Sequence, residues 1–135
     1  MNGRSLLTGF AGFLLCLSLS CGKKSGSVTN ALKAVPVTNL VADVRAFALQ
    51  AGAEEWTWEG KDSRLPKTVR TLAPIRVTLR KETSVSFVEI KLSGGFLPHG
   101  FLITCETNVA YTNKLYGNGW EVRPIADGIY EYSGF

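Results

Sequence analysis

The spacing of apolar residues changes at Pro74, and this change limits the folds that the chain can adopt. Before Pro74, the apolar residues of segment 38–51 recur with the spacing of an amphipathic helix. After Pro74, apolar and polar residues alternate along residues 75–80, which is typical of a strand with one face in water. The sequence therefore predicts helices first and a sheet after them.

Segment 38–51 is predicted to be the longer helix. Thr38 or Asn39 can cap its start, and Gly52 can end it. Its apolar side chains form a stripe that must be buried against another element, and a sheet is the natural partner.

A second, shorter helix is predicted over residues 65–72. Pro66 is acceptable in its first turn, and Pro74 prevents the helix from continuing. Both predicted helices precede the sheet along the chain.

Alternating residues predict strands that are joined by short polar or glycine-rich turns. The turn signals are residues 81–84, 93–95, 117–119 and 127–128. The predicted strands cover residues 75–80, 87–92, 101–105, 120–123 and 129–132. Sequential strands with short connections favour antiparallel pairing. We therefore expect an α+β fold in two layers, with an antiparallel sheet of about four to five strands and one long and one short helix on one face.

The length and composition favour a single folded domain. The chain has 135 residues, of which 45% are apolar and 19% are charged, a balance typical of globular proteins. Its formal net charge is +4. If Arg4 is removed with a signal segment, 14 Lys and Arg residues remain against 11 Asp and Glu residues, which is about +3. This excess is too small to indicate a nucleic-acid-binding protein.

Residues 1–20 have the layout of an export signal peptide. Arg4 supplies a positive start, and apolar residues dominate positions 6–19. Gly9 and Gly12 interrupt this apolar run, which is shorter than the ~20 residues that a membrane-spanning helix needs. We therefore predict that this segment directs export and is then removed.

The end of the predicted signal peptide carries a cysteine. Residues 17–21 read Leu-Ser-Leu-Ser-Cys, so the small residue Ser20 directly precedes Cys21. This segment resembles the lipobox of bacterial lipoproteins, in which the cysteine is diacylated before cleavage. Ser18 and Leu19 stand where a lipobox usually has leucine and a small residue. The resemblance implies that Cys21 carries acyl chains such as palmitate and thereby holds the protein at a membrane.

Ser18 and Ser20 also form the small-x-small pattern of an ordinary secretory cleavage site. A secreted protein with an unmodified Cys21 is therefore the alternative. Residues 22–27 contain only Gly, Ser and Lys, a composition typical of a flexible tether. The predicted organisation is a signal peptide (1–20), a tether (21–36) and a small α+β domain (37–135). The domain would lie in the cell envelope, facing the periplasm or the cell surface.

Cys105 is the thiol expected to remain in the domain, because Cys16 leaves with the signal peptide and Cys21 is acylated. An unacylated Cys21 could instead reach Cys105 through the tether and form a disulfide. As an enzyme nucleophile, Cys105 would need His99, the only histidine, as its base. Six residues of extended strand would separate the two by about 20 Å. We therefore predict a small buried strand cysteine, with no catalytic pair, metal site or cofactor.

Two pairs of alternating aromatic residues stand out in the domain. Trp56 and Trp58 would share one face of an extended segment, as would Tyr130 and Tyr132. The functional interpretation is a surface that binds an envelope protein or a cell-wall glycan. The structural interpretation is core packing against the long helix, because a small domain needs its large side chains for its core.

These observations together predict a small, lipid-anchored bacterial envelope protein with a binding or structural domain and no enzymatic activity. Its partners would be the membrane, through acylated Cys21, and an envelope protein or glycan, but no nucleic acid. The alternatives are a secreted, unlipidated binding or inhibitor module and a small enzyme that depends on Cys105.

Overall fold

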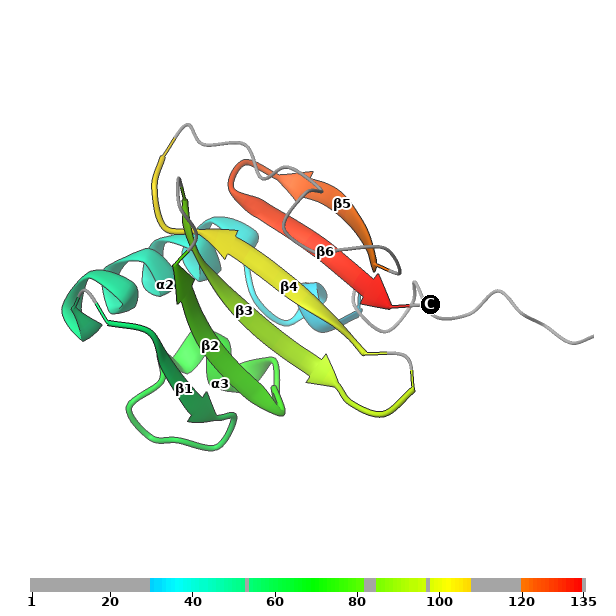
Figure 1. Ribbon diagram of the computed structural model, residues 1–135, viewed down its shortest axis with the longest axis horizontal. Coiled ribbons are helices and arrows are strands. Elements are labelled where there is room, and N and C mark those ends of the chain that lie inside the picture. The colour runs from blue at the N-terminus through cyan, green and yellow to red at the C-terminus, as the bar shows by residue number, and fades with distance from the viewer. Residues whose placement is uncertain (1–29, 53, 82–84, 97, 108–119, 135) are drawn as a thin grey trace, which may run out of the picture.

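The computed structural model describes residues 30–52, 54–81, 85–96, 98–107 and 120–134. These residues form a six-stranded antiparallel sheet, with helices packed on one of its faces (Figure 1). In chain order the elements are α2 (Val37–Ala51), β1 (Trp56–Glu59), α3 (Lys67–Thr71), β2 (Arg76–Lys81), β3 (Ser86–Ser93), β4 (His99–Thr104), β5 (Trp120–Ala126) and β6 (Ile129–Gly134). The predicted α+β class is therefore confirmed.

The sheet has six strands, so the expected number of four to five is wrong. Its strand order is β1-β2-β3-β4-β6-β5, and every neighbouring pair is antiparallel. The additional strand is β1, in which Trp56 lies opposite Leu79 and Trp58 lies opposite Val77. A four-residue strand is too short for periodicity to identify, and its pairing with β2 makes it a strand.

The long helix begins at Val37, one residue before the predicted start. The predicted cap at Thr38 or Asn39 is wrong, because Pro36 occupies the capping position and no side chain caps the helix. Pro36 has no N–H, and its carbonyl accepts a hydrogen bond from the Leu40 N–H at 3.0 Å. Gly52 ends the helix as predicted, with a φ of 84° that favours glycine.

The short helix, α3, is shorter than predicted, because Pro66 precedes it and Leu72 follows it. Leu65 and Leu72 are nevertheless buried with Val69 in the core. The apolar spacing of this segment was therefore a good guide to burial but not to the ends of the helix.

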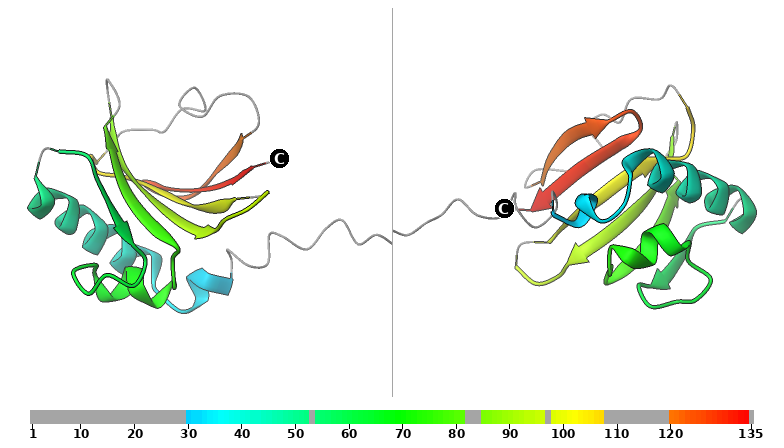
Figure 2. Two further views of the ribbon diagram at one scale, coloured as in Figure 1. Left: turned by 60° about the horizontal axis from the view of Figure 1, so that its bottom comes forward. Right: turned by 180° about the vertical axis from the view of Figure 1, so that it is seen from behind.

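The main core lies between the helices and one face of the sheet (Figure 2). From the helix side it receives Leu40, Val41, Val44 and Ala48 of α2. From the sheet it receives Val77, Leu79, Val88, Ile90, Phe101, Ile103 and Ile129. These sheet residues alternate with others that point to the opposite face, which no described helix covers.

The folded part of the chain extends to the N-terminal side of residue 37, where the tether was expected to meet the domain. Residues 30–33 form a helical turn, and Ala31 and Leu32 pack against the main core. Val35 is only 3% exposed and belongs to this core. The predicted signal peptide and Cys21 lie outside the described residues.

Two predicted turns are described by the structure. Asp127 and Gly128 form the turn between β5 and β6, and Gly128 has a φ of 74°. Gly95, with a φ of 82°, lies in the connection between β3 and β4. The predicted turn at 117–119 lies outside the described residues, as does most of the one at 81–84. Within the described part of the chain, no helix has the length and apolar character required to cross a bilayer.

Candidate functional site

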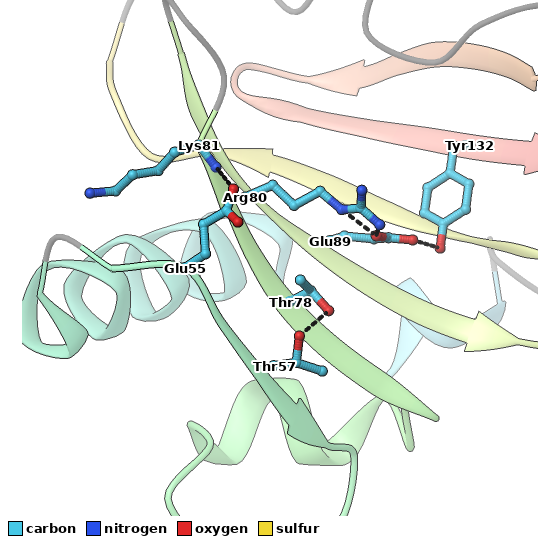
Figure 3. Close-up of polar contacts among 7 residues, drawn as sticks. All are labelled: Glu55, Thr57, Thr78, Arg80, Lys81, Glu89 and Tyr132. Atoms are coloured by element: carbon cyan, nitrogen blue, oxygen red, sulfur yellow. Dashed lines mark hydrogen bonds and ion pairs between the residues drawn. The ribbon is translucent and has the colours of Figure 1, made fainter.

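The face of the sheet opposite α2 and α3, called the second face below, carries a line of polar side chains. Thr57 of β1 and Thr78 of β2 lie opposite each other, with 3.3 Å between their hydroxyl oxygens. Arg80 follows two residues after Thr78 and therefore projects from the same face. Glu89 of β3 lies opposite Thr78 and completes the line toward the centre of the sheet (Figure 3).

Glu89 is the central group of this line and is only 6% exposed. The Tyr132 hydroxyl donates a hydrogen bond of 2.9 Å to its Oε1 atom. The Arg80 guanidinium binds its other oxygen, with Nε at 3.2 Å and Nη2 at 3.1 Å from Oε2. A buried carboxylate is costly unless its charge is paired and its oxygens accept hydrogen bonds, and these two residues meet both needs (Figure 3).

Tyr132 reaches Glu89 across an intervening strand because Gly100 leaves room for its ring. Tyr132 lies on β6, Glu89 lies on β3, and β4 runs between them. Gly100 is the β4 residue opposite Tyr132. A Cβ atom at Gly100 would lie 3.0 Å from Cε1 of the ring and 2.0 Å from the carbonyl oxygen of Ile90. A side chain at this position would therefore disturb both the strand pairing and the tyrosine.

A second apolar cluster supports the polar line from one side. Phe87, Leu102 and Tyr132 are buried together on the second face, and Trp120, Val122 and Tyr130 pack against them. The rings of Trp120 and Tyr132 have centroids 5.5 Å apart. Packing of the ring and the hydrogen bond to Glu89 therefore both hold Tyr132 in place, with its hydroxyl directed toward Glu89.

A hollow of about 350 Å³ opens at the β1 edge of this polar line. It is lined by Glu55, Trp56, Thr57, Thr78, Leu79 and Arg80. Glu55 Oε1 accepts a hydrogen bond of 3.1 Å from the Lys81 backbone N–H, which holds the carboxylate beside the hollow (Figure 3). Its volume is at the small end of the range for ligand pockets, and its wall offers both donors and acceptors.

The four aromatic residues predicted as a binding surface do not lie together. Trp56 and Trp58 face the helices, where their ring centroids are 3.9 Å apart and both contact Phe47. Tyr130 and Tyr132 belong to the cluster on the second face, and Tyr132 is fully buried. The two pairs therefore pack in the two separate apolar clusters of the domain.

A charged pair borders the tryptophans. Arg64 binds both carboxylate oxygens of Asp62, with Nε at 3.0 Å from Oδ1 and Nη2 at 2.6 Å from Oδ2. These hydrogen bonds lower the pKa of Asp62 to about 2. The Arg64 guanidinium also lies 5.4 Å from the centroid of the Trp58 ring, a cation–π distance.

One polar atom near this aromatic group has no partner. Among the described side chains, the indole N–H of Trp56 is buried without a hydrogen-bond acceptor. Burying a donor in this way costs about 1 to 3 kcal/mol. The contacts of the Trp56 ring with Phe47 and Trp58 offset part of this cost.

Cys105 and His99 lie at opposite ends of β4, because His99 begins the strand and Cys105 directly follows its last residue. His99 Nδ1 is hydrogen-bonded to the Ser93 hydroxyl. Burial raises the pKa of the Cys105 thiol to about 11, with a further contribution from Glu106. The thiol is therefore protonated at neutral pH and has no histidine beside it.

A second hollow, of about 340 Å³, lies beside Cys105. It is lined by Ala48, Leu49, Gly52, Leu79, Lys81, Ser86, Cys105 and Glu106. Within the described ranges, no three His, Cys, Asp or Glu side chains cluster in a way that could hold a metal ion.

Comparison with protein-family models, with curated proteins and with solved structures finds no match to this chain. The site is therefore interpreted from its own geometry.

The sequence did not single out Glu89 or Arg80. The alternation in β3 placed Glu89 on the face opposite Val88 and Ile90, which is correct, but it gave no indication that Glu89 is buried. Phe87 could have indicated that this face is partly buried, because it lies two positions before Glu89 on the same face and a large aromatic side chain favours burial. The partner Tyr132 lies 43 positions away, and no local pattern connects the two.

Proposed function

We propose that this chain is a small lipid-anchored bacterial envelope protein whose domain binds a polar ligand without catalysing a reaction. The lipobox-like segment before Cys21 supports the anchor. The folded domain has begun by Asn30, only nine positions beyond Cys21, so the anchor would hold the domain close to the membrane.

The observation that carries the binding part of the proposal is the hollow beside Thr57, Thr78 and Arg80. Two hydroxyls and a guanidinium lie beside Glu55, so the wall contains two neutral hydroxyl groups, a positively charged donor and a negatively charged acceptor. A ligand with many hydroxyl groups can both donate hydrogen bonds to such a wall and accept hydrogen bonds from it. A cell-wall glycan fits this chemistry, and the polar surface of an envelope protein is the alternative ligand.

The geometry around the titratable groups favours binding over catalysis. Both oxygens of Glu89 already accept hydrogen bonds from Tyr132 and Arg80, so this carboxylate is occupied. A thiol with a pKa of about 11 is a poor nucleophile at neutral pH, because the thiolate is the reactive form.

Mass spectrometry of the mature protein from the producing cells tests the anchor. We expect an N-terminal Cys21 that carries acyl chains, and we expect Cys21→Ser to move the protein from the membrane fraction to the soluble fraction. An unmodified Cys21 at the mature N-terminus would contradict the proposal and favour the secreted module, for which the Ser18-x-Ser20 pattern is the supporting observation.

Nuclear magnetic resonance titration tests the ligand. The chain from residue 21 to residue 135 with Cys21→Ser would be titrated with soluble glycan fragments released from the cell wall. We expect shifts of the Thr57, Thr78 and Arg80 signals, and we expect Thr57→Val with Thr78→Val to weaken binding. Thr68, whose hydroxyl binds Asp43 on the helix side, is the matched control. Shifts around Thr68 instead of Thr78 would place the ligand elsewhere.

A further inference from the structure

The connection between β3 and β4 presents a bare aromatic side chain at one end of the molecule. Phe96 is 95% exposed and follows Gly94 and Gly95 in this turn. Single exposed apolar residues are common on protein surfaces, so Phe96 alone assigns no function to the turn. Its surroundings and its position relative to the predicted anchor are the informative observations.

A second apolar side chain and two cations lie next to this turn. Ile75 is exposed, and its Cδ1 atom lies 3.7 Å from where a Cβ atom on Gly94 would be. Arg76 and Lys91 lie opposite each other on β2 and β3, at the end of the sheet from which the turn emerges. Glu59 is the acidic residue across from Arg76.

The first described residues lie toward the same end of the molecule as this turn. Figures 1 and 2 show the helical turn at residues 30–33 and the β3–β4 connection toward one end, and the C-terminal end of α2 at the other. Nine positions of chain between Cys21 and Asn30 can span at most about 30 Å. As a flexible tether they would span about 17 Å on average, which is similar to the radius of a domain of this size. An acylated Cys21 would therefore keep this end of the domain near the membrane.

We infer that the β3–β4 turn contacts the same membrane that holds Cys21, with Phe96 in the headgroup region and Arg76 and Lys91 facing anionic headgroups. An aromatic side chain backed by cations is the composition that favours binding to the membrane interface. This inference rests on the proposed acylation of Cys21. It also orients the domain, because the hollow beside Thr57 and Arg80 lies at the other end of β1 and β2 and would point away from the bilayer.

Photocrosslinking tests this contact in the acylated mature protein. p-Benzoylphenylalanine would replace Phe96 in one variant and Leu49 in the other. Leu49 is the matched control, because it is apolar and 83% exposed but lies near the C-terminal end of α2. Each variant would be reconstituted into vesicles of phosphatidylethanolamine and phosphatidylglycerol, irradiated and analysed by mass spectrometry.

We expect phospholipid adducts in the variant with the photocrosslinker at position 96 and none in the variant with it at position 49. Equal adduct formation at both positions, or none at position 96, would overturn the inference. Protein adducts in place of lipid adducts at position 96 in intact cells would also overturn it and would identify the turn as a protein-binding surface.

Charge variants test the role of the two cations. Arg76→Gln with Lys91→Gln should reduce adduct formation at position 96 in vesicles that contain phosphatidylglycerol, and should leave it unchanged in vesicles of phosphatidylcholine alone. An unchanged yield in the anionic vesicles would overturn the contact between these cations and the headgroups.

The same spectra separate this inference from the proposed function. A protein without acyl chains on Cys21 would contradict the proposed anchor, and with it the basis of the membrane contact. An acylated protein without lipid adducts at position 96 would contradict only the contact and leave the anchor in place.

Discussion

At the residue scale, Glu89 illustrates how a charged side chain can belong to the interior of a small sheet. It lies on a central strand and is almost completely buried, yet both of its oxygens have partners. Arg80 balances the charge, while the Tyr132 hydroxyl satisfies the second oxygen. Removing either partner would leave a buried carboxylate incompletely compensated, which is more costly than the loss of a neutral hydrogen bond.

Tyr132→Phe should therefore destabilise the domain. The variant keeps the ring and its packing but removes the donor to Glu89, so we expect the free energy of unfolding to fall by roughly 1.5 to 3 kcal/mol, the range for hydrogen bonds to charged groups. Urea denaturation followed by tryptophan fluorescence measures this change.

Tyr130→Phe is the comparison for this measurement, since it makes the same chemical change two positions earlier on the same strand, where the side chain is half-buried and lies opposite Leu102 of β4. In a double-mutant cycle, Tyr132→Phe and Glu89→Gln should be non-additive. Additive effects of the two substitutions would show that the hydrogen bond does not couple them.

Cys105 makes a different contribution at the residue scale, through its raised pKa. Burial is the main cause, Glu106 adds to it, and Arg45 and Lys81 act in the opposite direction. The folded thiol keeps its proton up to about pH 11, whereas the thiol of the unfolded chain loses its proton near pH 9.0. Between these two pH values the unfolded state binds fewer protons than the folded state.

The contribution of Cys105 to stability should consequently be complete below pH 9.0 and decrease as the pH rises toward about 11. Urea denaturation across this window would be compared for the parent chain and Cys105→Ala, both carrying Cys21→Ser. The difference in unfolding free energy between them should change with pH in this window. Parallel pH profiles would contradict the raised pKa.

At the element scale, α2 follows the behaviour expected of an amphipathic helix. Its buried residues recur on one side and face the sheet, whereas Leu49 on the same helix is exposed. No side chain caps its start, so packing of this apolar stripe is the main source of its stability. The two leucines of α2 therefore provide a direct comparison of buried and exposed positions.

Leu40→Ala should lower the free energy of unfolding by about 2 to 5 kcal/mol, because Leu40 is fully buried and its loss leaves a cavity. Leu49→Ala makes the same change on the same helix at an exposed position, and we expect an effect within about 0.5 kcal/mol. Chemical denaturation of both variants measures the difference. Similar losses for the two would show that the stripe does not supply the stability of the helix.

The smallest strand, β1, shows what element-level patterns miss. Its alternation of Trp and Thr places the two tryptophans against Phe47 and Thr57 on the second face. From the sequence, the tryptophans could be interpreted either as core residues or as part of a ligand-binding surface. Only the pairing of β1 with β2 assigns the Trp side to the core and the Thr side to the polar hollow.

At the scale of the whole molecule, the folded domain includes residues that were expected to belong to the tether. Ala31, Leu32 and Val35 contact the main core, so the segment before α2 contributes to the domain and shortens the tether. This boundary matters for the proposed function, because it sets how far the domain can lie from an acylated Cys21.

A chain that begins at residue 37 should be less stable than one that begins at residue 30. Loss of Val35 alone removes buried methyl groups worth about 2 kcal/mol, and the loss of Leu32 adds to this. Thermal or urea unfolding of the two chains measures the difference. Lys33→Ala in the longer chain is the control, since Lys33 is exposed in the same segment. Equal stability of the two chains would contradict the structural role of this segment.

Local sequence patterns were sufficient to predict some of the helices, strands and turns of this protein. The spacing of apolar residues identified α2, the alternation in β2 and β3, and the turn at Gly128, because each depends on neighbours that are close in the sequence. The export signal and the lipobox-like Cys21 are also read from adjacent residues, and they stay predictions. The separation of Cys105 from His99 followed from strand geometry alone.

The tertiary structure decided the rest, for one physical reason: burial depends on contacts between residues far apart in the chain. Val35 became core because the segment before α2 folds onto the sheet, and β1 became a strand because β2 pairs with it. Glu89 can be buried on the second face because the side chain of Tyr132, 43 positions away, extends over Gly100 of β4 and donates a hydrogen bond to the Glu89 carboxylate. No local spacing encodes that crossing, which requires the strand order β3-β4-β6.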